Sequence, residues 1–240
     1  MNMVSVIIPV YNCDEYLEKA LNSVFDQTLS KEDYEVIVVN DGSTDNTLDI
    51  LEKYEDRIEL INQPNNGLVY SINRAIKKSK GNYIIRLDAD DYFDKNLISF
   101  CLEILEKNPQ YHCVYTDRYE ISKQDDSNPV VVNIGDNNIF DMIACGTLFC
   151  REVFDKIDLY RDLLFEEYDF MIRFFNNNFK AYYLQKPLYY YIKHGSNMTQ
   201  QKNYWEKGWS QLLDLWGEKE LKKYIDIQIQ IKGMSRFKKA

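Results

Sequence analysis

Short apolar runs alternate with amphipathic segments along roughly the first ninety residues of the chain. Four of these runs have the length and composition of strands covered on both faces, at residues 4–8, 34–39, 58–61 and 83–87. The segments between them carry apolar residues at helical spacing, as at Leu17, Leu21 and Val24. This alternation predicts a βαβαβαβ unit, with helices on both faces of a mainly parallel sheet. We expect the first two strands to be neighbours in that sheet.

Polar residues after the strands predict where the helices begin. Asn12 followed by Glu15 has the spacing of a capping box for the first helix. Ser43 or Thr44 is expected to cap the second helix. The third helix is predicted from an apolar stripe at Leu68, Val69, Ile72 and Ile76.

The pattern is looser beyond Asp91. We expect one helix over residues 95–107, which ends before Pro109, and another that begins near Glu166. The polar residues 123–128 are predicted to form a surface loop. Further strands are predicted at residues 113–116, 130–133, 181–184 and 188–192.

Residues 201–240 are predicted to form a C-terminal appendage to a domain of residues 1–200. A helix docked by its aromatic face is expected from Trp205, Trp209, Leu212, Leu213 and Trp216. Residues 218–240 contain seven basic and three acidic side chains, and isoleucines alternate over residues 225–231. We expect this tail to pack on the body or on a second copy of the chain, or to contact an anionic membrane surface. A solvated terminus is the alternative.

Composition excludes several classes of protein. The 240 residues are 45% hydrophobic with 9 Gly and 5 Pro, which suits a compact domain. A net charge of -9 disfavours nucleic-acid binding. The sequence has neither a run of about 20 apolar residues nor a basic segment before residues 4–8, so we expect a cytoplasmic protein, peripheral at most to the inner face of the membrane. The five cysteines are Cys13, Cys101, Cys113, Cys145 and Cys150. Their odd number and the absence of a C-x-x-C pair argue against a disulfide framework and against a zinc site.

Three polar clusters follow predicted strands, at residues 9–12, 40–45 and 88–91. Parallel sheets collect ligands at this end of their strands. In the third cluster, Asp88, Asp90 and Asp91 would repel one another unless a cation compensated their charge. Mg²⁺ or Mn²⁺ would suit, because each takes one or two carboxylates together with phosphate oxygens. A solvated acidic turn is the alternative.

The other clusters leave both a functional and a structural interpretation open. Asp41 can accept hydrogen bonds from a base N–H or a ribose hydroxyl, or belong to an ordinary strand-to-helix turn. Glu166-Glu167-Tyr168-Asp169 suits an acidic site or a favourable first helical turn. His194 lies in a polar loop that could face a site. The sequence contains neither G-x-G-x-x-G nor G-x-x-x-x-G-K, which argues against a dehydrogenase and a P-loop NTPase.

Taken in order, these segments resemble the inverting glycosyltransferases of family 2, which have the GT-A fold. The similar segments within roughly the first 95 residues are residues 4–12, 38–45, 65–67 and 81–91. Farther on, Glu166-Glu167-Tyr168-Asp169 is similar to the family's Glu-Asp motif. Tyr190-Tyr191 followed by His194 resembles its Tyr-x-x-His ending.

The resemblance implies a Rossmann-like nucleotide-sugar-binding half, residues 1–94, and an acceptor half, residues 95–200. It implies a hexosyltransferase of polysaccharide biosynthesis that moves a sugar, with inversion and metal assistance, from a nucleoside diphosphate sugar of UDP type. The acceptor would be a hydroxyl of a saccharide or a lipid-linked molecule. The donor-binding residues would be Pro9, Tyr11, Asn12, Asp41, Asn66, Gly67, Arg86, Asp88 and Ala89.

The resemblance also implies roles for the acids. Asp88 and Asp90 match the DxD motif around the metal, with Asp90 the direct ligand. Glu167 would deprotonate the acceptor, and Glu166 would face elsewhere because adjacent helical residues point about 100° apart. His194 and Lys193 would contact the diphosphate or the metal.

Three positions depart from the family pattern. Ile72 and Ile192 stand where many members have Arg, and Glu167 stands where Asp is usual. The candidates to replace the missing cations are Arg74, Arg86 and Lys193. The alternatives are a pseudoenzyme that binds a nucleotide sugar without transferring it, and a nucleotidyltransferase.

Overall fold

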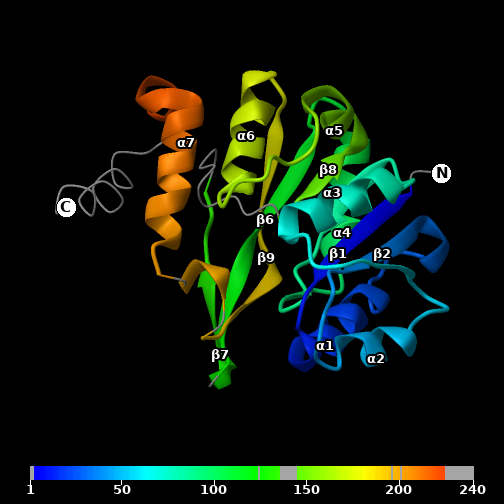
Figure 1. Cartoon of the computed structure of the whole chain (residues 1–240). Helices are drawn as coiled ribbons and strands as arrows, with labels where there is room; N and C mark the ends of the chain where they lie inside the picture. The colour runs from blue at the N-terminus through cyan, green and yellow to red at the C-terminus, as the bar shows by residue number, and fades with distance from the viewer. Residues whose placement is uncertain (1–2, 124, 136–144, 196, 201, 225–240) are drawn as a thin grey trace.

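The computed structural model describes residues 3–123, 125–135, 145–195, 197–200 and 202–224. Its strands form one sheet in the order β3-β2-β1-β4-β8-β6-β9-β5, with β7 paired to β6 (Figure 1). The strands are β1 (Val4–Val10), β2 (Tyr34–Asn40), β3 (Glu59–Asn62), β4 (Tyr83–Arg86), β5 (Tyr92–Phe93), β6 (Cys113–Ser122), β7 (Asp125–Val132), β8 (Leu148–Cys150) and β9 (Ala181–Lys193). The α-helices are α1 (Asp14–Phe25), α2 (Thr47–Glu52), α3 (Leu68–Lys78), α4 (Leu97–Lys107), α5 (Arg151–Ile157), α6 (Glu166–Asn176) and α7 (Tyr204–Leu221).

The first four strands confirm the predicted parallel unit. β1 lies between β2 and β4 and is parallel to both, and β3 is parallel to β2. Val4 stands opposite Tyr34, so the two strands expected to be neighbours are neighbours. The carboxyl ends of β1, β2 and β4 therefore meet at one edge, where the polar clusters lie.

The second half of the sheet is mixed. β8 is antiparallel to β4 and to β6, whereas β9 is parallel to β6. The prediction of two strands at residues 181–184 and 188–192 is wrong, because β9 is continuous. Its register against β6 shifts between Leu184 and Pro187, and such a bulge accommodates a proline within a strand.

A second correction concerns the polar residues 123–128. Most of this stretch belongs to β7, which forms a hairpin with β6 and places Ser122 opposite Asp125. Residues 127–131 of β7 are exposed, so burial did not require apolar side chains there. The apolar pattern consequently failed to reveal the start of this strand.

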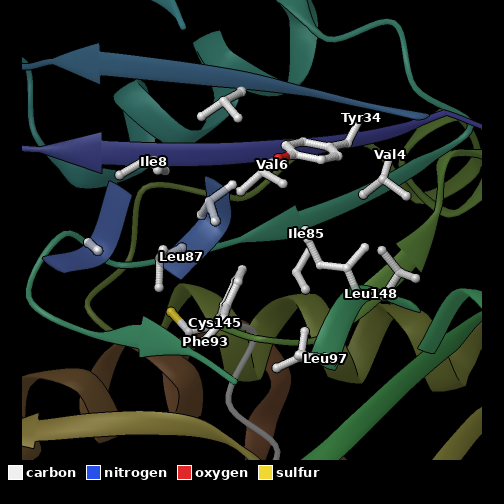
Figure 2. Packing of buried hydrophobic residues seen from close by; sticks show 14 of the residues in the cluster. Val4, Val6, Ile8, Tyr34, Ile85, Leu87, Phe93, Leu97, Cys145 and Leu148 are labelled. Carbon is white, nitrogen blue, oxygen red and sulfur yellow. The ribbon is translucent and has the colours of Figure 1, made fainter. Parts of the chain in front are cut away.

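Two hydrophobic clusters cover the two faces of the sheet. Val4, Val6 and Ile8 of β1 belong to the cluster under α1, α2 and α4, part of which Figure 2 shows. Ile7 points to the other face and belongs to the cluster under α3, α5, α6 and α7. This alternation is the period-2 pattern of a strand that is buried on both faces.

The expected aromatic helix after residue 200 is α7, which stands beside α6 (Figure 1). Leu212 is fully buried, and Trp209 and Trp216 pack against the same cluster. Gly217 departs from helical geometry with φ 71 near the end of the helix. The alternating isoleucines at residues 225–231 lie outside the described residues, so their packing stays a prediction. No helix in the described part of the chain is long and apolar enough to cross a membrane.

Phe149 of β8 tests the second cluster. Its ring is 2% exposed and packs edge-on against Phe154, Phe170 and Phe174. We predict that Phe149→Ala lowers the free energy of unfolding by about 3–5 kcal/mol in urea denaturation. Tyr70→Ala, at a side chain that is 54% exposed, is the control and should change it by about 0.5 kcal/mol or less. Similar losses in both variants would contradict this packing.

Candidate active site

The loops after β1 and β2 hold each other through side-chain hydrogen bonds. The backbone N–H of Asn12 donates to Ser43 Oγ at 3.0 Å, and the N–H of Thr44 donates to Asn12 Oδ1 at 2.7 Å. The predicted caps are therefore wrong. Cys13 precedes α1 without a side-chain cap, and Asn12, with φ 48, joins the two loops instead. Of the other predicted donor-binding residues in this loop, Pro9 lies in buried β1 and Tyr11 is 50% exposed.

Asp41 organises the loop that leads into α3. Its side chain is buried, and Oδ1 accepts hydrogen bonds from Gln63 Nε2 at 2.6 Å and from the backbone N–H of Asn66 at 2.9 Å. Oδ2 accepts from the N–H of Gly67 at 2.8 Å. Gly67 has φ 92, a conformation that favours glycine. Three of the predicted donor-binding residues are thus in direct contact.

Arg86, the last residue of β4, joins the tip of that strand to the beginning of α6. The guanidinium is 5% exposed and binds Asp88 through Nε at 2.7 Å and Nη2 at 3.1 Å. Its Nη1 donates to Glu166 at 3.1 Å and to Glu167 at 3.2 Å. The expectation that Glu166 faces elsewhere is wrong, because both long side chains converge on one nitrogen although they leave the helix in different directions. Arg74, Arg86 and Lys193 were the predicted substitutes for the missing arginines. Of these, Arg86 contacts Asp88, Glu166 and Glu167 in the described part of the chain, whereas Arg74 binds Gln63.

Burial and charge oppose each other around Arg86. Burial alone would lower the pKa of Arg86, but the charges of Asp88, Glu167 and Glu166 hold that pKa well above its ordinary value. Burial raises the pKa of Glu166, and the positive charge of Arg86 opposes the rise. The cation is therefore what allows several carboxylates to lie together in a water-poor region.

Cys145 is a member of this cluster that the sequence did not indicate. Its Sγ lies 2.9 Å from Asp88 Oδ2 and 3.8 Å from Glu167 Oε1. Burial raises the pKa of this thiol well above its ordinary value, so the thiol keeps its proton and donates to Asp88. The residue comes near because its backbone bridges to Arg86, a long-range pairing with no local sequence signal.

The acids after β4 have separate partners. Asp91 is buried, accepts a hydrogen bond from the Ile192 N–H at 2.7 Å and binds the Tyr189 hydroxyl, so it fastens β9 to this loop. Asp90 lies 2.9 Å from Nε2 of His194, which stacks on Tyr16. Ala89, another predicted donor-binding residue, is 6% exposed.

The structure separates the two predicted diphosphate contacts. His194 reaches Asp90, whereas the ammonium group of Lys193 pairs with Glu120. Lys193 is the last residue of β9, and His194 lies just beyond the strand. Lys193 therefore does not contact the acids after β4.

The acids after β4 suit a divalent cation that a ligand helps to coordinate. In the described ranges, no three His, Cys, Asp or Glu side chains form a ready-made metal site. Burial and the charge of Asp88 raise the pKa of Asp90, and a cation would relieve both effects. Carboxylate oxygens of Asp88 and Asp90 are the hard ligands that Mg²⁺ and Mn²⁺ prefer, with phosphate oxygens to complete the shell.

A small cavity of about 10 Å³, room for about one water molecule, lies on the second half of the sheet beside Cys145. Its walls include Tyr115, Arg118, Thr147 and Tyr189. Because Cys145 also contacts Asp88 and Glu167, this cavity borders the acids that contact Arg86.

We predict that Arg86→Met lowers the free energy of unfolding by about 3–5 kcal/mol, because it leaves Glu166 buried without its cation. Arg74→Met is the matched control, since Arg74 is exposed, and should cost about 0.5 kcal/mol or less. Chemical denaturation measures both. Equal stability of Arg86→Met and the wild type would contradict the proposed charge balance.

Comparison with known proteins agrees with this geometry. Residues 5–158 match the family described as Glycosyl transferase family 2. EpsE of Bacillus subtilis (strain 168) is 32% identical over 207 residues, which cover 78% of this chain and 71% of EpsE. The chondroitin synthase of Pasteurella multocida (strain Pm70) is 37% identical over 123 residues, or 50% of this chain. The chain spans only 12% of that synthase.

Solved structures support the same fold. The structure of Staphylococcus aureus TarS residues 1–349 in complex with UDP-GlcNAc has a TM-score of 0.76 at 23% identity, covering 98% of this chain and 75% of that one. The mannosyltransferase PcManGT of Pyrobaculum calidifontis, in complex with GDP-Man and Mn²⁺, has a TM-score of 0.65 at 16% identity, covering 80% and 56%. The expected GT-A fold is therefore confirmed. From the family match and the similarity to EpsE, we conclude that this chain belongs to glycosyl transferase family 2.

Proposed function

We propose that this chain transfers a sugar from a nucleoside diphosphate sugar to an acceptor hydroxyl with inversion. The observation that carries the proposal is the double attachment of Arg86, which binds Asp88 on the donor side and Glu167 at the start of α6. This arrangement brings a metal-binding motif and a candidate base together at one buried cation. A pseudoenzyme or a nucleotidyltransferase would not require the second attachment.

The proposed donor is a UDP sugar, held along the carboxyl ends of β1, β2 and β4. TarS, whose structures contain UDP-GlcNAc and UDP, supports this choice of nucleotide. Asp41 would bind the base or ribose, since Oδ2 spends one lone pair on Gly67 and can accept a second hydrogen bond. Asn12, Asn66 and Gly67 would shape the same side of the donor site.

The proposed cofactor is Mg²⁺ or Mn²⁺ on Asp88 and Asp90, and the Mn²⁺ in the PcManGT complex supports a divalent cation. When bound, such a cation supplies charge stabilisation for the departing diphosphate. Asp90 would be the direct ligand. His194, which lies 2.9 Å from Asp90, would orient that carboxylate and contact the diphosphate.

Glu167 is the proposed general base. Its side chain is 17% exposed against 8% for Glu166, so Glu167 is the more accessible of the two acids. The Glu167 carboxylate takes the proton of the acceptor hydroxyl while the acceptor oxygen forms a bond to C1 of the sugar. The bond between C1 and the diphosphate oxygen breaks, and the nucleoside diphosphate leaves with the electron pair. One displacement of this kind inverts C1.

We further infer a saccharide or lipid-linked acceptor, which would approach from the side of Glu167, the more exposed of the two acids at the start of α6. A role in polysaccharide synthesis is part of the proposal, and the similarity to a chondroitin synthase supports it. The proposed cytoplasmic location agrees with the free thiols among the described residues. Contact with the inner face of the membrane, or with a second copy, through the basic tail is part of this proposal.

Asp90→Ala tests the metal assignment. We predict that Mn²⁺ strengthens UDP binding to the wild type in calorimetry, and that Asp90→Ala removes this enhancement because a ligand to the cation is lost. Asp94→Ala, four residues beyond Asp90 and directly after β5, is the control. An equal response to Mn²⁺ in Asp90→Ala and the wild type would place the ion elsewhere.

Glu167→Gln tests the base. We predict that UDP release from UDP-GlcNAc, with water as the acceptor, falls by about 10²-fold or more, because the amide cannot accept the proton. Affinity for UDP should be nearly unchanged. Glu166→Gln, on the neighbouring buried acid, should have a milder effect on the rate. An inactive Glu166→Gln beside a fully active Glu167→Gln would assign the role of base to Glu166. If the wild type released no UDP from any donor tested, the result would support the pseudoenzyme.

A further inference from the structure

Helix α7 contacts residues 164–165, which directly precede Glu166 and Glu167 of α6. We propose that α7 is a positioning element for transfer, which fixes Glu167 relative to Arg86. This inference rests on the proposed function of Glu167 as the base. It gives the region after residue 200 a role in the reaction, through residues that do not touch the donor.

The first contacts of α7 are hydrogen bonds to the backbone of Leu164. Its carbonyl oxygen accepts a hydrogen bond from the Tyr204 hydroxyl at 2.9 Å. Its N–H donates to Gln211 Oε1, also at 2.9 Å. Both polar groups of one peptide residue are thus held by side chains of α7, two positions before Glu166. Such a pair of bonds fixes the segment in two directions.

The next residue, Phe165, is held by its ring. It is 4% exposed and makes edge-on contacts with Tyr204, Trp205 and Trp209, at centroid distances of 5.5, 5.5 and 5.6 Å. Gly208 lies directly against it, since a Cβ at this position would be 2.5 Å from Phe165 Cε1. The absence of a side chain at Gly208 therefore allows the ring to sit where it does.

A third contact lies on the far side of the acids. Trp216 Nε1 donates to Asp169 Oδ1 at 3.0 Å, and Asp169 is fully buried beside Arg173. Glu166 and Glu167 therefore lie between two points of attachment to α7, at residues 164–165 and at residue 169. Arg86 is the attachment from the opposite direction.

Position matters here more than affinity. A base must lie within hydrogen-bond reach of the acceptor proton, and displacement by about 1 Å can cost about 10²-fold in rate. UDP, by contrast, is proposed to bind at β1, β2 and β4, which α7 does not cover. Loss of the contacts between α7 and residues 164–165 should therefore lower kcat and leave the affinity for UDP unchanged.

Gly208→Ala is the test, because the added methyl group must displace Phe165, while alanine itself favours a helix. We expect kcat for UDP release from UDP-GlcNAc with Mn²⁺ to fall by about 10-fold or more, with the UDP dissociation constant changed by less than about 2-fold. Tyr204→Phe, which removes one hydrogen bond to Leu164 and keeps the ring, should show a smaller loss of the same kind. Glu206→Gln, on an exposed side chain of the same helix, should match the wild type.

The same changes in the Glu167→Gln background show whether α7 acts through the base. If it does, Gly208→Ala adds no further loss to the residual rate, because coupled residues are not additive. If Gly208→Ala and Tyr204→Phe had the wild-type kcat while Glu167→Gln was inactive, the inference about α7 would be overturned and the assignment of Glu167 as the base would stand. An equal fractional loss in both backgrounds would also overturn it. Full activity of Glu167→Gln would instead overturn the assignment of the base.

Discussion

A single buried guanidinium connects the end of β4 to the beginning of α6. Arg86 is the last residue of β4 and is 5% exposed, yet it contacts Asp88, Glu166 and Glu167. A charge in that position is tolerated only because the carboxylates compensate it, and they depend on it in the same way. The end of β4 and the start of α6 are therefore linked through one charged side chain.

The remaining contacts divide the work of keeping this edge in place. The Asp91 carboxylate binds β9. The Asp41 carboxylate accepts three hydrogen bonds from the segment before α3. Asp90 pairs with His194, and its side chain is 27% exposed. Acids that look equivalent in the sequence thus differ in their surroundings because the fold supplies each with different partners. On the other side, α7 gives α6 an attachment that Arg86 alone does not supply.

Local patterns were sufficient for the first half and insufficient for the second. β1, β2 and β4 are mostly buried, and their apolar runs indicated their positions and their parallel arrangement. The start of β7 and the continuity of β9 were missed, because an exposed edge strand and a bulge at Pro187 interrupt the apolar pattern. The motifs indicated Asp88, Asp90 and Glu167, but the convergence of Glu166 on Arg86 and the approach of Cys145 depend on long-range packing.

A crystal structure of the chain with UDP and Mn²⁺ tests the central claim most directly, since that claim concerns where the donor lies relative to Arg86 and Glu167. The account predicts the ion on Asp90, the diphosphate beside the β4 tip, and the Glu167 carboxylate open toward the side from which an acceptor would approach C1. An ion held by other residues, or a diphosphate bound at Arg118 instead of beside Asp88 and Asp90, would contradict it.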